Sequence, residues 1–194
     1  MSVLFDPQGN RKYLTKAERR TFLEAAKLEE REQRTFCEML HYGGARISEV
    51  LALAPQRVDL EGQCVTFESL KKRRSGVFRN VPLPADFIER LDLVHGIREQ
   101  QRQQKFQPRL WRFSRTTGWR IVKRVMARSG VAVEQAATAK GLRHGYGVAA
   151  ITQDVPLNMV QKWLGHASIT TTAIYADAVG EEERQIAARM WDSE

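Results

Sequence analysis

The stretch KWLGHASITTTAIY, residues 162–175, places a glycine, a histidine and a tyrosine at the end of an apolar helical pattern. Apolar residues recur at helical spacing up to Leu164, and Gly165 follows where helices commonly end in a left-handed residue. His166 is therefore expected on a tight turn, with Tyr175 nine residues later. Taken alone, a histidine at such a turn is usually a cap or a surface residue, and a tyrosine is usually a packing ring. Other segments must decide whether these two act together.

The composition favours a polyanionic partner. In 194 residues, Lys and Arg number 31 against 23 Asp and Glu, which gives a net charge of +8. This length is typical of a single domain. Cys37 and Cys64 lie far apart, and no Cys-x-x-Cys or His/Cys ligand spacing occurs. We therefore expect buried thiols in a reducing cytoplasm and predict no metal site.

Membrane and nucleotide signals are missing from the sequence. No apolar run approaches the roughly 20 residues that span a bilayer, and the N-terminus has no signal-peptide core. We expect a soluble, cytoplasmic protein with no membrane partner. Neither a Gly-rich phosphate loop nor a Gly-x-Ser-x-Gly elbow is present. Any covalent chemistry is therefore predicted to proceed without ATP, without a serine triad and without a small-molecule cofactor.

The N-terminal part is predicted to be helical after a short lead. Residues 1–12 show no periodicity and are expected to form a flexible segment, whereas residues 13–194 are expected to form one domain. A capping box over residues 15–18 predicts the start of a helix, and a second helical pattern ends at residues 43–44, two glycines.

A short helical segment and a small sheet follow. Arg46 and Glu49 are three residues apart in that segment, so their side chains can touch. From Val58 to Val81 the period changes to that of strands, and we predict three short antiparallel strands. The second turn carries four consecutive cations, Lys71 to Arg74. Such a run is usually a solvated loop, and it could equally grip a backbone phosphate.

The rest of the chain is predicted to be helical. One helix spans Phe87 to Ile97, and Thr117 is expected to cap the next. On that next helix a basic face fits contact with nucleic acid, formed by Arg120, Lys123 and Arg124. Lys140-x-x-Arg143 opens a further helix, and a last amphipathic helix covers about residues 180–192. The predicted class is mainly α with a small three-stranded antiparallel sheet (α+β).

Three motifs occur in a set order: GARISEV at residues 44–50, LRH at 142–144, and LGH at 164–166 followed by Tyr175. Together they resemble the catalytic domain of the tyrosine recombinases, also called the phage-integrase family, over roughly residues 14–191. The resemblance implies that family's fold. It also implies a site-specific recombinase that cleaves and rejoins double-stranded DNA through a 3′-phosphotyrosine, in integration, excision, inversion or resolution. Dimers or tetramers on DNA, and a prokaryotic, phage or mobile-element context near the nucleoid, are implied as well.

The resemblance also implies roles for single residues. Tyr175 would attack phosphorus, and the covalent bond would conserve energy so that religation needs no nucleotide cofactor. Arg46 and Arg143 would bind the non-bridging phosphate oxygens, which planar guanidinium groups fit well. His166 would hydrogen-bond the same phosphate. The family's hairpin lysine protonates the leaving 5′-oxygen, which points to Lys71, with Lys72 as the alternative.

Two features depart from the family pattern. Lys140 stands where the family usually has histidine, and an ammonium with an ordinary pKa near 10.4 accepts protons poorly, so a slower reaction or a shifted pH optimum is expected. A separate N-terminal helical domain is expected to be absent, which makes DNA binding strongly salt-dependent. In the remaining assignments, Glu49 orients Arg46, and His144 supports the site without reacting. DNA contacts are assigned to Lys72, Arg73, Arg74, Arg120, Lys123 and Arg124.

Several alternatives stay open at this stage. The Arg46–Glu49 contact is equally explained by an ordinary ion pair within a helix. The C-terminal helix is expected to pack either on its own domain or on a neighbouring protomer. In place of a recombinase, the fold is also compatible with a catalytically weak DNA-binding regulator or accessory protein, favoured by Lys140, or with a type IB topoisomerase that relaxes supercoils.

Overall fold

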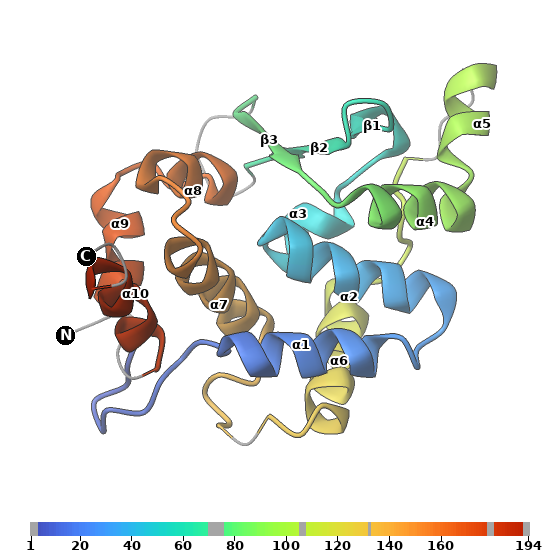
Figure 1. The fold of residues 1–194 in the computed structure, drawn as a ribbon. Coiled ribbons are helices and arrows are strands. Elements are labelled where there is room, and N and C mark those ends of the chain that lie inside the picture. The colour runs from blue at the N-terminus through green and yellow to red at the C-terminus, as the bar shows by residue number, and fades with distance from the viewer. Residues whose placement is uncertain (1–3, 70–75, 105–107, 132, 178–180, 192–194) are drawn as a thin grey trace.

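The computed structural model describes residues 4–69, 76–104, 108–131, 133–177 and 181–191. The predicted class is confirmed: most of the elements are helices, and they accompany one three-stranded antiparallel sheet (Figure 1). The elements are α1 (Lys16–Ala26), α2 (Arg31–Gly43), α3 (Ile47–Leu51), η1 (Pro55–Arg57), β1 (Val58–Asp59), β2 (Cys64–Glu68), β3 (Phe78–Pro82), α4 (Ala85–His95), α5 (Ile97–Gln103), α6 (Arg115–Arg128), α7 (Ala139–Thr152), α8 (Leu157–Leu164), α9 (Thr170–Ala173), η2 (Ile174–Asp177) and α10 (Glu181–Trp191).

Helix ends follow the local signals in most places. The Thr15 hydroxyl accepts from the backbone N–H of Glu18, whose carboxylate accepts in return from that of Thr15, so the predicted capping box opens α1. Gly165 ends α8 in the left-handed region, with φ of 67°. Gly96 does the same between α4 and α5, where we expected one continuous helix.

The cap of α6 differs from the prediction. Ser114, not Thr117, occupies the N-cap, and its hydroxyl accepts from the backbone N–H of Thr117 at 3.0 Å. Both residues have capping chemistry, and the helix simply begins one turn earlier than the apolar pattern indicates.

The sheet has the order β1-β2-β3, and Val65 on the middle strand lies opposite Val58 and Val81. In Figure 1 the sheet lies along the upper edge, with α8 on one side and α4 on the other. Along β3, burial alternates with period two, so that Arg79 and Val81 face inward. An arginine therefore takes a core-facing position, and this position matters for the site described below.

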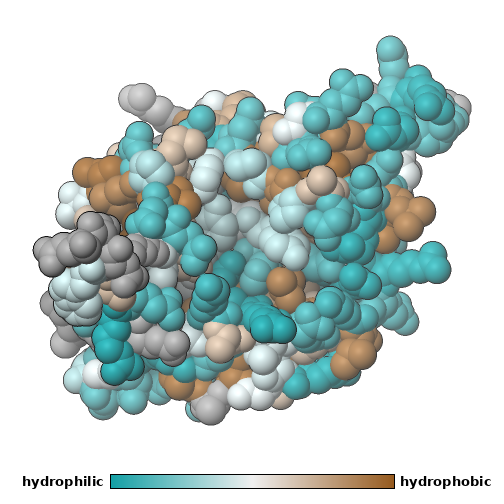
Figure 2. All heavy atoms as spheres, viewed as in Figure 1, coloured by the Kyte–Doolittle hydropathy of each residue, from teal (hydrophilic) through white to brown (hydrophobic). Residues whose placement is uncertain are grey.

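Two hydrophobic clusters build the interior. The larger lies among α1, α2, α4, α6 and the sheet and contains Phe22, Phe36 and Trp111. The smaller gathers Leu4, Val148, Leu164 and Tyr175. On the face seen in Figure 2, hydrophilic residues predominate and apolar ones form small separate groups. None of the described helices is both long and apolar enough to cross a membrane.

Residues 4–12 differ from the expected flexible lead. Leu4 is fully buried in the smaller cluster, and its carbonyl accepts from the backbone N–H of Lys12 at 2.7 Å. Phe5 and Arg11 form an antiparallel bridge. The signal was hidden because a short bridge has no periodicity, and Leu4 is a single apolar residue.

Candidate active site

Arg46 and Glu49 contact each other at the start of α3. Arg46 is the extended residue just before α3, and Glu49 reaches back to it. The Glu49 carboxylate accepts from the Arg46 backbone N–H at 2.9 Å and from its Nη1 at 2.8 Å, so the predicted contact is present. The Glu49 side chain is fully buried, whereas that of Arg46 is 32% exposed. Arg46 therefore extends from a buried anchor toward solvent.

Arg143 joins the ends of two helices. It lies on α7, is almost fully buried, and donates from Nη1 to the carbonyl of Gly44 and from Nη2 to that of Leu164, both at 2.7 Å. Its Nη1 also lies 4.0 Å from Oε2 of Glu49. Burial, followed by repulsion from Arg46, lowers the pKa of Arg143 to about 10, so the group is still cationic at neutral pH.

Tyr175 lies on η2 and is 1% exposed. Its ring rests directly on α7: a Cβ added at Gly147 would lie 2.5 Å from ring carbons, so only glycine fits there. The hydroxyl lies 3.3 Å from Nδ1 of His144. Burial raises the pKa of Tyr175, while Arg143 and Arg46 oppose the rise. Burial outweighs the two cations, so the resting phenol is protonated at neutral pH, and the cations reduce the cost of forming the phenolate that a nucleophile requires.

His166 follows the left-handed Gly165 and stacks beside Tyr175, with ring centroids 6.1 Å apart and planes 20° apart. Its Nδ1 lies 3.0 Å from the hydroxyl of buried Thr172. Burial, then the charges of Arg143 and Arg46, lower the pKa of His166 to about 4. The imidazole is therefore neutral at pH 7, with its other ring nitrogen available for a ligand.

Lys140 is exposed in the first turn of α7, one turn before His144. Burial lowers the pKa of His144 to about 4, and the charge of Lys140 adds to that effect. His144 is thus neutral at pH 7, and its Nδ1 can accept a hydrogen bond from the Tyr175 hydroxyl. The positive charge of Lys140 therefore helps to keep His144 neutral.

The structure brings Arg46, Arg143, His166 and Tyr175 together, as the sequence predicted, although the four come from four separate segments. The carboxylate of Glu49 contacts Arg46 directly and lies near Arg143. Both arginines act on the pKa values of Tyr175 and His166. The two guanidiniums and the imidazole therefore form one cluster that could bind an anionic group beside the phenol of Tyr175.

A cavity of about 540 Å³ opens beside His166, between β3 and α8. The described residues that line it include no acidic one: Ser69, Val77, Phe78, Arg79, Asn80, Asn158, Gln161, Lys162, Gly165 and His166. The Lys162 ammonium and the amides in this lining suit an anionic ligand such as a nucleic-acid strand, whereas the Arg79 guanidinium is bound to Glu49.

Sequence reasoning missed Arg79. Its side chain is 5% exposed, and its Nη2 donates to Oε2 of Glu49 at 2.7 Å. A signal was present: strand alternation puts residue 79 on the same face as Val77 and Val81, where an apolar residue is expected. A cation at a core-facing strand position calls for a buried partner, and here that partner is Glu49.

The basic face of α6 is less uniform than predicted. Arg124 pairs with Glu29 at 2.5 Å, and Lys123 donates from Nζ to the carbonyl of Ala137 at 3.2 Å. These two side chains are therefore committed to the protein itself. Arg120 is exposed beside Trp119, which is 52% exposed. Of the three predicted contacts, only Arg120 has neither an ion pair nor a side-chain hydrogen bond within the described part of the chain.

The predicted hairpin cations Lys71, Lys72, Arg73 and Arg74 lie outside the described residues. Within the residues that are described, no group of three or more His, Cys, Asp or Glu side chains could hold a metal ion.

Comparison with known proteins places these features in context. A family model described as the phage integrase family matches residues 12–182. The chain is 27% identical over 188 residues to tyrosine recombinase XerA of Thermococcus onnurineus, covering 92% of this chain and 62% of that protein. It is 30% identical over 150 residues to tyrosine recombinase XerD of Mycobacterium tuberculosis, covering 73% of this chain and 46% of that protein. The chain therefore spans less than two thirds of the length of either relative.

Solved structures share the fold. A crystal structure of XerA recombinase superposes with a TM-score of 0.75 at 23% identity, covering 92% of this chain and 64% of that one. XerH recombinase in a post-cleavage complex with difH DNA gives 0.74 at 25% identity, covering 99% and 57%. The catalytic domain of bacteriophage HP1 integrase gives 0.63 at 19% identity, covering 90% and 93%. With its motifs, its fold and a family match over residues 12–182, the chain belongs to the phage integrase family.

Proposed function

We propose that the chain catalyses site-specific DNA recombination, cleaving and rejoining strands through a 3′-phosphotyrosine formed by Tyr175. The observation that carries the proposal is the buried Glu49 carboxylate. It holds Arg46 at 2.8 Å and lies 4.0 Å from Arg143, in a site whose two arginines act on the phenol of Tyr175. Two guanidiniums can bind the non-bridging oxygens of a phosphodiester, which would place its phosphorus beside a tyrosine nucleophile.

The chemistry follows from these positions. Arg46 and Arg143 bind the non-bridging oxygens, where negative charge grows as Tyr175 attacks phosphorus. An acceptor for the phenol proton lies 3.3 Å away at Nδ1 of neutral His144. The bond from phosphorus to the 5′-oxygen breaks, and the leaving oxygen takes a proton from Lys71 or Lys72. Neutral His166 donates to the phosphate.

The partner in this proposal is double-stranded DNA, in keeping with the net charge of +8. XerH has been solved on difH DNA before and after cleavage. We further propose that the chain acts as a dimer or tetramer on DNA. Met190 and Trp191 on α10 are 73% and 67% exposed, although α10 also contacts α7 of its own chain. Exposed apolar side chains at a terminal helix favour packing on a second protomer.

The decisive experiment is a suicide-substrate assay on DNA that flanks the gene. A nick near the cleavage site lets the short 5′-hydroxyl fragment diffuse away, so the covalent intermediate accumulates. Native protein should form a denaturant-resistant adduct, and Tyr175→Phe should form none because it has no nucleophilic oxygen. If the native protein binds this DNA and forms no adduct, the proposed activity is wrong.

A second candidate is a DNA-binding accessory protein with little catalysis of its own. It is favoured by Lys140, an exposed ammonium where the family usually has histidine. The Lys140→His variant separates the two. A large gain of cleavage in that variant, over a native protein that has almost none, would support the accessory role.

A further inference from the structure

Arg79 connects three elements from a buried position. Its Nη2 donates to Glu49 on α3 at 2.7 Å, and its Nε donates to the carbonyl of Trp163, near the end of α8, at 2.7 Å. Both side chains of the Arg79–Glu49 pair are at most 5% exposed. One guanidinium on β3 thus fixes the distance between the helix of Glu49 and the helix that leads to His166.

The contact with α8 extends to the turn that carries His166. A Cβ added at Gly165 would lie 3.0 Å from Cδ of Arg79 and 3.2 Å from its Nη1, so the turn rests on the guanidinium itself. Nη1 is buried and has no hydrogen-bond partner among the residues that the structure describes. A buried donor without a partner is unfavourable, which is typical of a group held in place for a reason other than stability.

The charges around Glu49 explain what Arg79 contributes. Oε2 of Glu49 lies 2.7 Å from Arg79 and 4.0 Å from Arg143. Without Arg79, the buried carboxylate would have Arg46 and Arg143 as its only cationic partners among the described residues, and it would draw both inward. With Arg79 in place, three guanidiniums face one carboxylate, and the excess of two positive charges is available to an incoming phosphate.

We propose that Arg79 is a positioning residue for strand cleavage, which neutralises Glu49 and supports the His166 turn so that Arg46, Arg143 and His166 reach one phosphate. This inference rests on the proposed recombinase activity. Arg79 does not itself touch the DNA in this scheme, so its loss should slow the reaction more than it weakens DNA binding.

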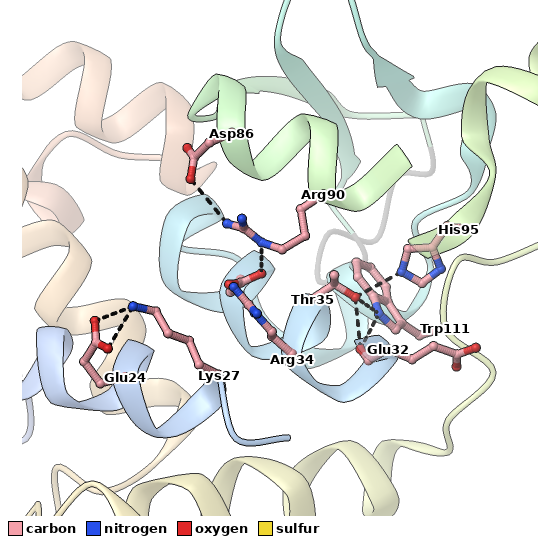
Figure 3. A network of polar contacts seen from close by, with 10 residues as sticks. Glu24, Lys27, Glu32, Arg34, Thr35, Asp86, Arg90, His95 and Trp111 are labelled. Carbon is pink, nitrogen blue, oxygen red and sulfur yellow. Dashed lines mark hydrogen bonds and ion pairs between the residues drawn. The ribbon is translucent and has the colours of Figure 1, made fainter. Parts of the chain in front are cut away.

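The chain contains a matched control. Glu38 on α2 is also a buried carboxylate, 3% exposed, held at 3.0 Å by both Arg34 and Arg90. Figure 3 shows Arg90 with Asp86 as a further partner. Among the described residues, the ion pairs of Arg90 are with Glu38 and Asp86, and neither belongs to the proposed site. Removing Arg90 therefore removes one of two arginines from a buried carboxylate without touching the site.

The test compares Arg79→Met with Arg90→Met in single-turnover cleavage of the suicide substrate at saturating DNA. Arg79→Met should cleave roughly 100-fold more slowly, since small misplacements of catalytic groups have effects of that order, while its DNA affinity changes less than about threefold. Arg90→Met should change neither quantity by more than about threefold. Equal cleavage rates for the two variants overturn the inference. If the native protein forms no adduct, the proposed activity and this inference both fall.

Two further variants keep the inference testable if Arg79→Met does not fold. Arg79→Lys retains the charge but has no planar fork to reach both Glu49 and the Trp163 carbonyl, so cleavage should slow about tenfold. A native rate for Arg79→Lys contradicts the positioning role. Glu49→Gln should lower the cleavage rate much less in the Arg79→Lys variant than in native protein, because Arg79 and Glu49 act as one unit. Fully additive losses would contradict this as well.

Discussion

Gly147 decides whether Tyr175 can occupy its place. The tyrosine ring lies where the Cβ of any other residue at position 147 would be, with ring carbons 2.5 Å from that Cβ. Gly147→Ala should therefore push Tyr175 away from His144 and Arg143, and reduce adduct formation by at least about 100-fold. Overpacking of this kind should also lower the free energy of unfolding by about 1–3 kcal/mol. The suicide-substrate assay and denaturant unfolding measure the two effects.

Ala149→Ser serves as the control for this substitution, because it adds one atom to the same helix at a half-buried position. It should leave adduct formation unchanged. Normal adduct formation by Gly147→Ala would mean that the catalytic position of Tyr175 is not the one that rests on α7.

At the scale of elements, α6 carries two arginines in different environments. Arg120 is exposed, whereas Arg124 pairs with Glu29, whose side chain is 5% exposed. Each lost phosphate contact should lower the slope of log affinity against log salt by about one unit. Arg120→Ala should therefore weaken DNA binding and reduce the slope by about one, while Arg124→Ala should leave the slope unchanged. Titrations at several salt concentrations measure it.

Arg124→Ala should instead act on stability, because Arg128, at 2.8 Å, is then the one ion-pair partner that Glu29 keeps among the described residues. The expected loss is below about 1 kcal/mol, since the side chains of Arg124 and Arg128 are 48% and 41% exposed and solvent screens their ion pairs. Equal slopes for native protein and Arg120→Ala would exclude a phosphate contact by Arg120.

Local signals predicted most of the elements, and distant contacts account for the side-chain pairings that were missed. The capping box at Thr15 and the helix stop at Gly165 depend on neighbouring residues, so both are readable in the sequence. Arg79 is 30 residues from Glu49, and Arg124 is 95 residues from Glu29. No local pattern encodes such pairings. The family motifs identified Arg46, Arg143, His166 and Tyr175, but a motif reveals only the residues that it contains.

At the scale of the whole molecule, the site lies where the two hydrophobic clusters meet. Phe67 and Leu142 belong to the larger cluster, whereas Leu164 and Tyr175 belong to the smaller. Arg143 spans this boundary through its bond to the Leu164 carbonyl. The packing of both clusters therefore bears on the geometry of the site, and conditions that loosen the fold should also impair cleavage.

Acid is such a condition, because all four histidines are held neutral. Burial is the first cause in each case: it lowers the pKa of His95, His144 and His166 to about 4, and lowers that of His41 well below its usual range. Between about pH 6.5 and 4 the unfolded chain binds protons that the folded chain does not, so stability is lost as the pH falls. Carboxylates with lowered pKa values add to this loss only near and below about pH 4.5.

The melting temperature should therefore fall when the pH is lowered from about 7 to about 5. His95 is the residue to test, because it lies outside the proposed site: Figure 3 shows it beside Thr35 and Trp111, and its Nε2 lies 3.0 Å from the Thr35 hydroxyl. His95→Gln keeps a hydrogen-bonding group there but cannot titrate. At about pH 5, protonation of His95 in the unfolded chain accounts for about 1–2 kcal/mol, so the variant should lose less stability on acidification than native protein. An identical loss in the two proteins would show that His95 is not held neutral by its burial.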